Sequence, residues 1–382
     1  MNASPIEFDL RLPDLTLEHG GTVHPLTVRG WMWGPDSADF LRCRGVSFRA
    51  VSSSLEKTTP PSTEAMSSGE RDVPTVLIVH ALTGDAQAGG DSGWWSPLIG
   101  PGRAFDPTQI RVLCFNNLGS CYGTSGPGDE GFPEGPVTTW DQSRALLRAL
   151  DRLALDRIAL VTGGSLGGMI TVALACLAPE RFERMVPVAA CKAASAWIIG
   201  FNHVQRRALE LVGHSPEGLA VARQIAMLSY RSEPGLDDRQ GRQRASSDAN
   251  APFRMQTYLD YQGQKFVGRF DPAAYVAMMD AMDSHDIERR PTCRDEGEQW
   301  TWPVTDMGID RIRAHCMAIG IDTDQLFFPV HSETIVQELA ERGRIAEYAI
   351  VHSRHGHDAF LIEWDQLDKI MRRALAMPAG RD

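Results

Sequence analysis

The chain has 382 residues, of which 43% are hydrophobic and 23% are charged, and its formal net charge is −11. These fractions are ordinary for a globular protein with a large core, and the acidic balance argues against general affinity for nucleic acid or for an anionic membrane. The sequence contains no apolar run of the roughly 20 residues that a membrane span needs and no visible secretory signal, so we expect a cytoplasmic protein.

Strand-like runs alternate with helical patterns in the first half of the chain. Thr75–Val79, Arg111–Phe115 and Arg157–Val161 have the composition of strands, and Trp140–Leu155 has the pattern of a helix. This alternation predicts an α/β fold with a mainly parallel sheet and helices on both faces.

We assign residues 1–194 to the first part of a core domain. Within it, residues 52–72 are rich in Ser, Thr, Pro and Glu, which is typical of a solvated or disordered loop. The seven cysteines are scattered and contain no Cys-x-x-Cys pair, so we interpret them as reduced and mostly structural, and we expect no metal site.

The residues from Gly163 to Gly168 read Gly-Gly-Ser-Leu-Gly-Gly and lie between an apolar run and an apolar, helix-like stretch. A strand, a tight Gly-x-Ser-x-Gly turn and a helix form the layout of a nucleophile elbow. Such a turn projects the serine hydroxyl clear of the backbone, and the N–H groups at the start of the helix favour a developing oxyanion. Ser165 is therefore the predicted nucleophile.

Between residues 195 and 292 the strand signals stop. Amphipathic helical stretches replace them, at Trp197–Val212, Pro216–Tyr230, Pro252–Phe266 and Pro272–Met282. We interpret this part as a helical lid inserted between two strands of the sheet. Residues 293–382 return to the alternation of strands and helices and are predicted to complete the core.

The partners of Ser165 are sought downstream, because the fold that uses this elbow orders them as serine, acid and histidine. The strand-like run Cys316–Ile321 is followed by Asp322 and Asp324, of which we select Asp324 as the acid. The next strand-like run is followed by three histidines, and we select His357 as the general base. Asp322 stays open as the alternative acid. His352 and His355 are interpreted as surface or structural residues.

Seven stretches make the chain similar to the homoserine O-acetyltransferase family of methionine biosynthesis, a branch of the α/β-hydrolase fold. They read HALTGD, NNLGSCYGTSGP, GGSLGGM, ARQIAMLSYRS, YLDYQGQKFVGRFD, DTDQLF and HGHDAFL, and they follow the family's order from about residue 75 to about residue 365. The resemblance implies an α/β-hydrolase fold with a helical lid, and a homodimer formed through that lid.

The resemblance also implies substrate-binding residues. Arg223 and Tyr230 match lid residues that contact the substrate, and Asp358 matches the partner of its ammonium group. Residues seven apart on a helix lie on the same face, so Arg223 and Tyr230 can point into one pocket. Each has a structural alternative: Arg223 as a surface charge, Tyr230 as core, and Asp358 as the N-cap of a helix over residues 359–363.

The expected reaction is transfer of an acetyl group from acetyl-CoA to the hydroxyl of L-homoserine by a ping-pong mechanism, with no permanently bound cofactor. Ser165 would form the acyl-enzyme, and the backbone N–H groups of Leu82 and Leu166 would hold the oxyanion. The alternatives are a succinyl donor, a serine acceptor, an esterase that uses water, and a non-catalytic binding scaffold. The last of these would require that Ser165 does not react.

Overall fold

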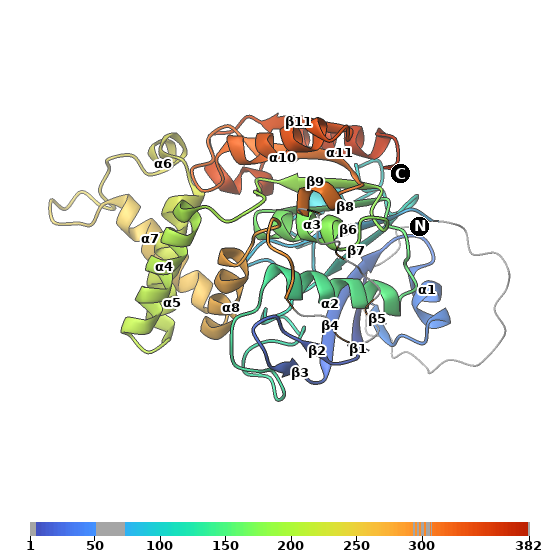
Figure 1. Cartoon of the computed structure of the whole chain (residues 1–382). Coiled ribbons are helices and arrows are strands. Elements are labelled where there is room, and N and C mark those ends of the chain that lie inside the picture. Colours follow the sequence, from blue (N-terminus) through green and yellow to red (C-terminus); the bar gives the residue numbers. More distant parts are fainter. Residues whose placement is uncertain are drawn as a thin grey trace.

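The computed structural model describes residues 5–50, 73–292, 295, 298, 302, 306 and 308–380. Its centre is a nine-stranded sheet (Figure 1), in the order β11-β10-β9-β8-β6-β7-β4-β1-β5. The strands are β1 (Ile6–Leu12), β4 (Leu26–Trp33), β5 (Phe48–Ala50), β6 (Thr75–Val79), β7 (Arg111–Phe115), β8 (Leu160–Gly164), β9 (Arg184–Val188), β10 (His315–Ile321) and β11 (Ala346–Val351), and a separate pair joins β2 (Leu15–Thr16) to β3 (Thr22–Val23). The loop predicted at residues 52–72 lies outside the described residues.

The sheet is parallel from β7 through β6, β8, β9 and β10 to β11. At its other edge, β4 pairs antiparallel with β7, and β1 pairs antiparallel with both β4 and β5. All residues of β6 and β7 are buried, as expected for strands that are covered on both faces. The predicted fold class, a mainly parallel sheet flanked by helices, is confirmed.

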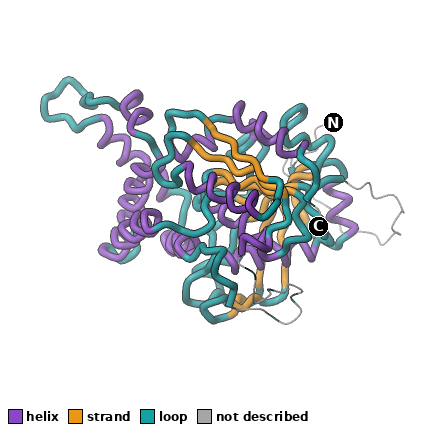
Figure 2. Tube along the Cα trace, turned by 45° about the horizontal axis from the view of Figure 1, so that its top comes forward, coloured by secondary structure: helices purple, strands orange, loops and turns teal. Residues whose placement is uncertain are grey.

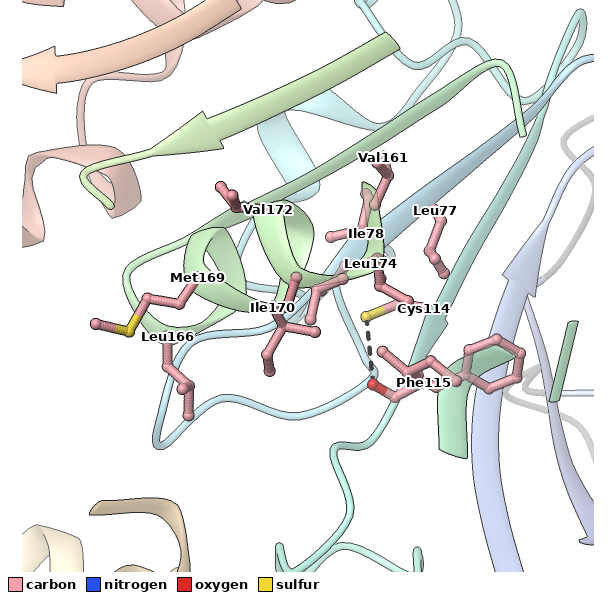
Figure 3. Packing of buried hydrophobic residues seen from close by; sticks show 14 of the residues in the cluster. Leu77, Ile78, Cys114, Phe115, Val161, Leu166, Met169, Ile170, Val172 and Leu174 are labelled. Atoms are coloured by element: carbon pink, nitrogen blue, oxygen red, sulfur yellow. Dashed lines mark hydrogen bonds between the residues drawn. The ribbon is translucent and has the colours of Figure 1, made fainter. Parts of the chain in front are cut away.

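Helix α3 follows directly from β8 and is buried along its whole length. Its apolar side chains, including Leu174, lie against residues of the central strands such as Ile78 and Val161 (Figure 3). Such burial fixes the start of α3, and with it Ser165, relative to the sheet. The helices of this core are α1 (Ser37–Cys43), η1 (Ser96–Leu98), α2 (Thr139–Arg152), α3 (Leu166–Leu177), α9 (Gly308–Arg311), α10 (Pro329–Glu341), η2 (Gly356–Leu361) and α11 (Trp364–Ala376).

Between β9 and β10 the chain forms helices that gather beside the sheet, away from the N-terminal strands (Figures 1 and 2). Side chains at their starts explain where several begin: Ser195 and Ser215 accept hydrogen bonds from N–H groups of the first turn, and Asp271 does so for Ala273 and Ala274. The helices are α4 (Ala196–Leu211), α5 (Pro216–Tyr230), α6 (Glu233–Arg239), α7 (Arg254–Val267) and α8 (Pro272–Asp283). We call them the lid; the domain boundaries at 194/195 and 292/293 stay predictions.

Two elements differ from the sequence-based expectation. Strand β8 covers residues 160–164 and not 157–161, because Ile158 forms only an isolated bridge with Phe182 while the main pairing begins at Leu160. The helix expected over residues 359–363 is instead the 3-10 helix η2, with Asp358 inside it and His355 before it. Asp358 is therefore not an N-cap.

Among the residues that the structure describes, no helix has the length and hydropathy needed to cross a bilayer. In the same residues, no group of three or more His, Cys, Asp or Glu side chains is arranged to hold a metal ion, and Cys43, Cys114, Cys121, Cys176, Cys191 and Cys316 are free thiols.

Candidate active site

Ser165 lies at the junction of β8 and α3 in a backbone conformation that residues with a side chain rarely adopt. Its φ is 59° and its ψ is −125°. Its N–H donates to the carbonyl of Val188 (2.9 Å), and its carbonyl accepts from the N–H of Met169 (3.0 Å). These bonds to β9 and to α3 hold the strained turn, and strain of this kind is typical of functional sites.

Gly167 allows the turn to lie directly beneath the end of β6. A Cβ atom at this position would lie 2.1 Å from the carbonyl oxygen of Val79, a distance that no real contact allows. The same carbonyl would meet a Cβ at Gly163 at 2.4 Å. Gly163 and Gly167 are thus required by the close approach of the turn to β6.

His357 and Asp324 form a buried pair. His357 follows β11 in η2, Asp324 follows β10, and the His357 Nδ1 lies 2.6 Å from the Asp324 Oδ2. The other oxygen of Asp324 accepts the N–H groups of Leu326 and Phe327, both at 2.8 Å, which fixes the carboxylate. A carboxylate can only accept, so Nδ1 carries the proton of the neutral ring and Nε2 offers its lone pair.

Asp322 does not compete for this histidine. Its Oδ2 lies 2.9 Å from the Nδ1 of His352, and its Oδ1 accepts the N–H of Ser353 at 2.9 Å. The geometry therefore favours Asp324, the residue selected from the sequence, as the partner of His357.

Aromatic rings enclose His357, which is only 2% exposed. Phe327 stacks on the imidazole at 5.0 Å between centroids, and the rings of Phe360 and Tyr230 lie 5.5 and 5.8 Å away. Burial by itself lowers the pKa of His357, but the charge of Asp324, its hydrogen bond and the charge of Asp358 raise this pKa overall. The Nε2 is buried and has no hydrogen-bond partner, so its lone pair is available to accept a proton.

The helix η2 also contacts the elbow. A Cβ atom at Gly164 would lie only 2.6 Å from the ring of Phe360. The segment that carries His357 therefore packs against the residue before Ser165. Ser165 follows the carboxyl end of β8 and His357 follows that of β11. Ligands bind at this edge of α/β sheets.

The loop after β6 carries Leu82, one of the predicted oxyanion donors. The N–H of Gly84 donates to the carbonyl of Ala81 (2.9 Å), which closes a turn around Leu82. The buried His80 anchors this turn: its Nε2 accepts the N–H of Asn117 (2.9 Å), so its Nδ1 donates to the carbonyl of Ala81 (2.7 Å). Leu166, the other predicted donor, is the first residue of α3 and has no intrahelical acceptor for its N–H.

His80 was not selected from the sequence, although it begins the HALTGD stretch. Burial lowers its pKa to about 4, against the opposing effect of its hydrogen bond to Ala81. A neutral imidazole with both nitrogens engaged in this way supports the loop and is not available as a base.

Arg223 and Tyr230 lie on α5 in the lid, and the ring of Tyr230 lies beside that of His357. The Arg223 guanidinium lies 5.4 Å from the centroid of the Tyr230 ring and 4.9 Å from that of Phe266. Its Nη1 is buried without a hydrogen-bond partner. Neither residue is a free surface side chain, and the unpartnered donor suits an anionic ligand.

Asp358, the third predicted substrate residue, is engaged by a residue that the sequence did not single out. The Oδ2 of Asp358 lies 3.1 Å from the Nη2 of Arg231, which directly follows Tyr230 at the end of α5. The seven-residue spacing that puts Arg223 and Tyr230 on one face of a helix gives no reason to place Arg231 in the same pocket. Its only signal is its place in the ARQIAMLSYRS stretch.

Residues 74–361 match the model of the alpha/beta hydrolase fold family. The homoserine O-acetyltransferase of Thermus thermophilus is 38% identical over 329 residues, which cover 78% of this chain and 80% of the relative, and that of Carboxydothermus hydrogenoformans is 33% identical over 90% of this chain and 98% of the relative. The chain belongs to the homoserine O-acetyltransferase family.

Solved structures agree on the fold. The homoserine O-acetyltransferase of Bacillus anthracis superimposes with a TM-score of 0.79 at 19% identity, covering 99% of both chains. Esterase E22 superimposes with a TM-score of 0.75 at 18% identity, covering 97% of this chain and 100% of the esterase. At such identities the fold alone is shared, so homoserine O-acetyltransferases and esterases can be distinguished only by their sites. The family resemblance read from the sequence motifs is confirmed.

Proposed function

We propose that this protein is a homoserine O-acetyltransferase that uses acetyl-CoA as the acetyl donor and Ser165, His357 and Asp324 as its catalytic residues. The observation that carries the proposal is the buried His357–Asp324 pair beside the strained elbow of Ser165, in a chain whose curated relatives are named for this reaction.

In the first half-reaction, the Oγ of Ser165 attacks the thioester carbonyl and gives its proton to Nε2 of His357. The imidazolium that forms is stabilised by Asp324, and the oxyanion by the N–H groups of Leu82 and Leu166. Collapse of the tetrahedral intermediate breaks the carbon–sulfur bond. The proton on His357 leaves with the thiol, and the acetyl group stays on Ser165.

In the second half-reaction, His357 takes the proton of the homoserine hydroxyl, whose oxygen attacks the acetyl ester. Collapse returns the proton to Ser165 and releases O-acetylhomoserine. In this proposal Arg223 receives the substrate carboxylate and Asp358 its ammonium group, and Tyr230 of the lid lies beside the imidazole of His357. These charges give an amino acid an advantage over water at the acyl-enzyme.

The test is thiol release from acetyl-CoA and from succinyl-CoA, each with homoserine, with serine and with no acceptor. We expect fast release only with acetyl-CoA and homoserine. The Ser165→Ala variant should form no acetyl-enzyme by mass spectrometry while it keeps the circular dichroism spectrum of the wild type. A preference for succinyl-CoA or for serine would change the assigned donor or acceptor. Thiol release without an acceptor would identify a hydrolase.

We further propose that the protein is a homodimer joined through the lid. Large apolar side chains are exposed on two lid helices that pack against each other: Val204 and Leu211 on α4, and Val221 and Leu228 on α5, with exposed fractions of 52%, 74%, 46% and 48%. In each helix the two residues are seven apart, so they share one face. Exposed apolar patches of this kind mark interaction surfaces.

A further inference from the structure

The proposed reaction gives no role to Arg231, which forms an ion pair with Asp358. Arg231 directly follows α5 in the lid, and Asp358 follows His357 in the core segment η2. The side chains are 17% and 14% exposed, so the pair lies mostly out of solvent. Such a pair is screened less by salt than a surface pair is, and its geometry has more effect on the site.

Arg231 holds only one oxygen of Asp358. Its Nη2 contacts Oδ2 at 3.1 Å, while its Nε and Nη1 are buried and have no hydrogen-bond partner. A guanidinium that binds a carboxylate through both forks would occupy both oxygens. Here, among the described residues, Oδ1 of Asp358 accepts no hydrogen bond.

We propose that Arg231 is a positioning residue for the choice of acceptor: it fixes Oδ2 of Asp358 so that Oδ1 stays available for the ammonium group of an amino-acid acceptor. The single contact orients the carboxylate without consuming its capacity to bind a cation. Because Arg231 comes from the lid and Asp358 from the segment of the catalytic base, the contact also sets this acidic group at a defined place beside His357. The inference rests on the proposed function, since it concerns the acceptor of that reaction.

The experiment compares two acceptors that differ by one group. Homoserine carries both an ammonium and a carboxylate, whereas 4-hydroxybutyrate carries the same hydroxyl and carboxylate without the ammonium. If Arg231 acts through Asp358, Arg231→Gln should lower the ratio of kcat/KM for homoserine over that for 4-hydroxybutyrate by at least about tenfold, the factor of a lost charge-assisted hydrogen bond. Asp358→Asn should lower the same ratio, and the double variant should be no lower than Asp358→Asn alone.

Arg354→Gln is the matched control, because Arg354 makes an exposed ion pair with Asp238 close to the same segment. Its ratio should equal that of the wild type. Arg231→Lys should recover part of the ratio, since it keeps the charge but not the planar fork. An equal loss with both acceptors in Arg231→Gln, or effects of Arg231→Gln and Asp358→Asn that add fully, would overturn the inference. A wild type that releases no thiol in response to homoserine would instead overturn the proposed function.

Discussion

Asp324 and Asp322 stand two residues apart after the same strand, yet each binds a different histidine. Asp324 is 2% exposed and lies against His357, whereas Asp322 lies against His352, whose side chain is 71% exposed. The two aspartates therefore provide a matched test of what a buried carboxylate does to the catalytic base.

We expect the rate of the first half-reaction to fall as the pH drops through the pKa of His357, because only the neutral imidazole can accept the proton of Ser165. Asp324 and Asp358 raise this pKa, so the midpoint should lie above the ordinary value of about 6.5. Single-turnover release of the thiol between pH 5 and pH 9 measures it. A midpoint below that ordinary value would contradict the assignment.

Replacing Asp324 by Asn should reduce the rate of thiol release by about 10⁴-fold, because the amide favours the wrong tautomer of the imidazole. Asp322→Asn is the control and should keep the wild-type rate, since its histidine lies elsewhere. Equal losses in the two variants would mean that the loop after β10, and not the charge beside His357, limits the reaction.

Arg223→Ala removes a guanidinium whose Nη1 has no protein partner and which we assign to the substrate carboxylate. The expected result is a fall of roughly 10- to 100-fold in kcat/KM for homoserine, with a much smaller change in formation of the acetyl-enzyme. Separate measurement of the two half-reactions decides this. Equal impairment of both would remove Arg223 from the acceptor site.

The sequence located the candidate catalytic residues because polar side chains directly follow buried strands, and parallel strands end at one edge of the sheet. It did not locate Arg231 or His80. The significance of both lies in what they touch, Asp358 in one case and Asn117 with Ala81 in the other, and contacts between distant segments leave no periodic signal.

At the scale of elements, the end of the lid helix α5 and the short helix α6 dock onto the segment before His357. The Ser232 hydroxyl donates to the carbonyl of Arg354, and Gly235 lies so close that a Cβ there would be 2.0 Å from the same oxygen. This docking joins the lid to the catalytic histidine through backbone atoms.

Gly235→Ala should push the two segments apart. We expect a loss of about 1–3 kcal/mol in the free energy of unfolding, together with a fall in homoserine-dependent turnover that exceeds what the loss of folded protein explains. Gly200→Ala, in α4, is the control: a Cβ there meets nothing within 4 Å, so this variant should be as stable as the wild type or up to about 1 kcal/mol more stable. Thermal melts and turnover at a temperature where both variants are folded provide the comparison. Similar behaviour of the two would show that the close approach is unimportant.

The ends of the lid helix α5 were predictable because their signals are local. The expected helix at Pro216–Tyr230 coincides with α5, which Ser215 caps and Pro216 begins. The start of β8 was not predictable to the residue, since pairing with β6 and β9 decides which residues of an apolar run enter the sheet.

At the scale of the molecule, the parallel half of the sheet follows from the alternation of strands and helices, but the antiparallel edge was not identified. Its signal is present: Ile6, Phe8, Leu10 and Leu12 alternate with exposed or half-buried residues along β1. That β1 lies between β4 and β5 depends on pairings between segments up to 44 residues apart, such as Ile6 with Ala50, which no local pattern reveals.

If the exposed faces of α4 and α5 join two copies of the chain, Leu211→Asp combined with Leu228→Asp should convert a dimer into a monomer, because each charge would be buried at the interface. Sedimentation equilibrium over a range of concentrations measures the change. Ile345→Asp, at a position outside the lid that is 44% exposed, should leave the dimer intact. A wild-type monomer would refute the proposed assembly directly.

The aromatic rings around His357 affect how long an acetyl group on Ser165 would survive. An acetyl group on Ser165 is an ester next to a base, and any water that reached Nε2 would hydrolyse it. Phe327, Phe360 and Tyr230 surround the imidazole and leave it 2% exposed. In the proposed reaction, these rings would keep water scarce and so lengthen the life of the acetyl-enzyme. The enzyme would then store an activated acetyl group until an acceptor arrives and would not need to hold both substrates at once.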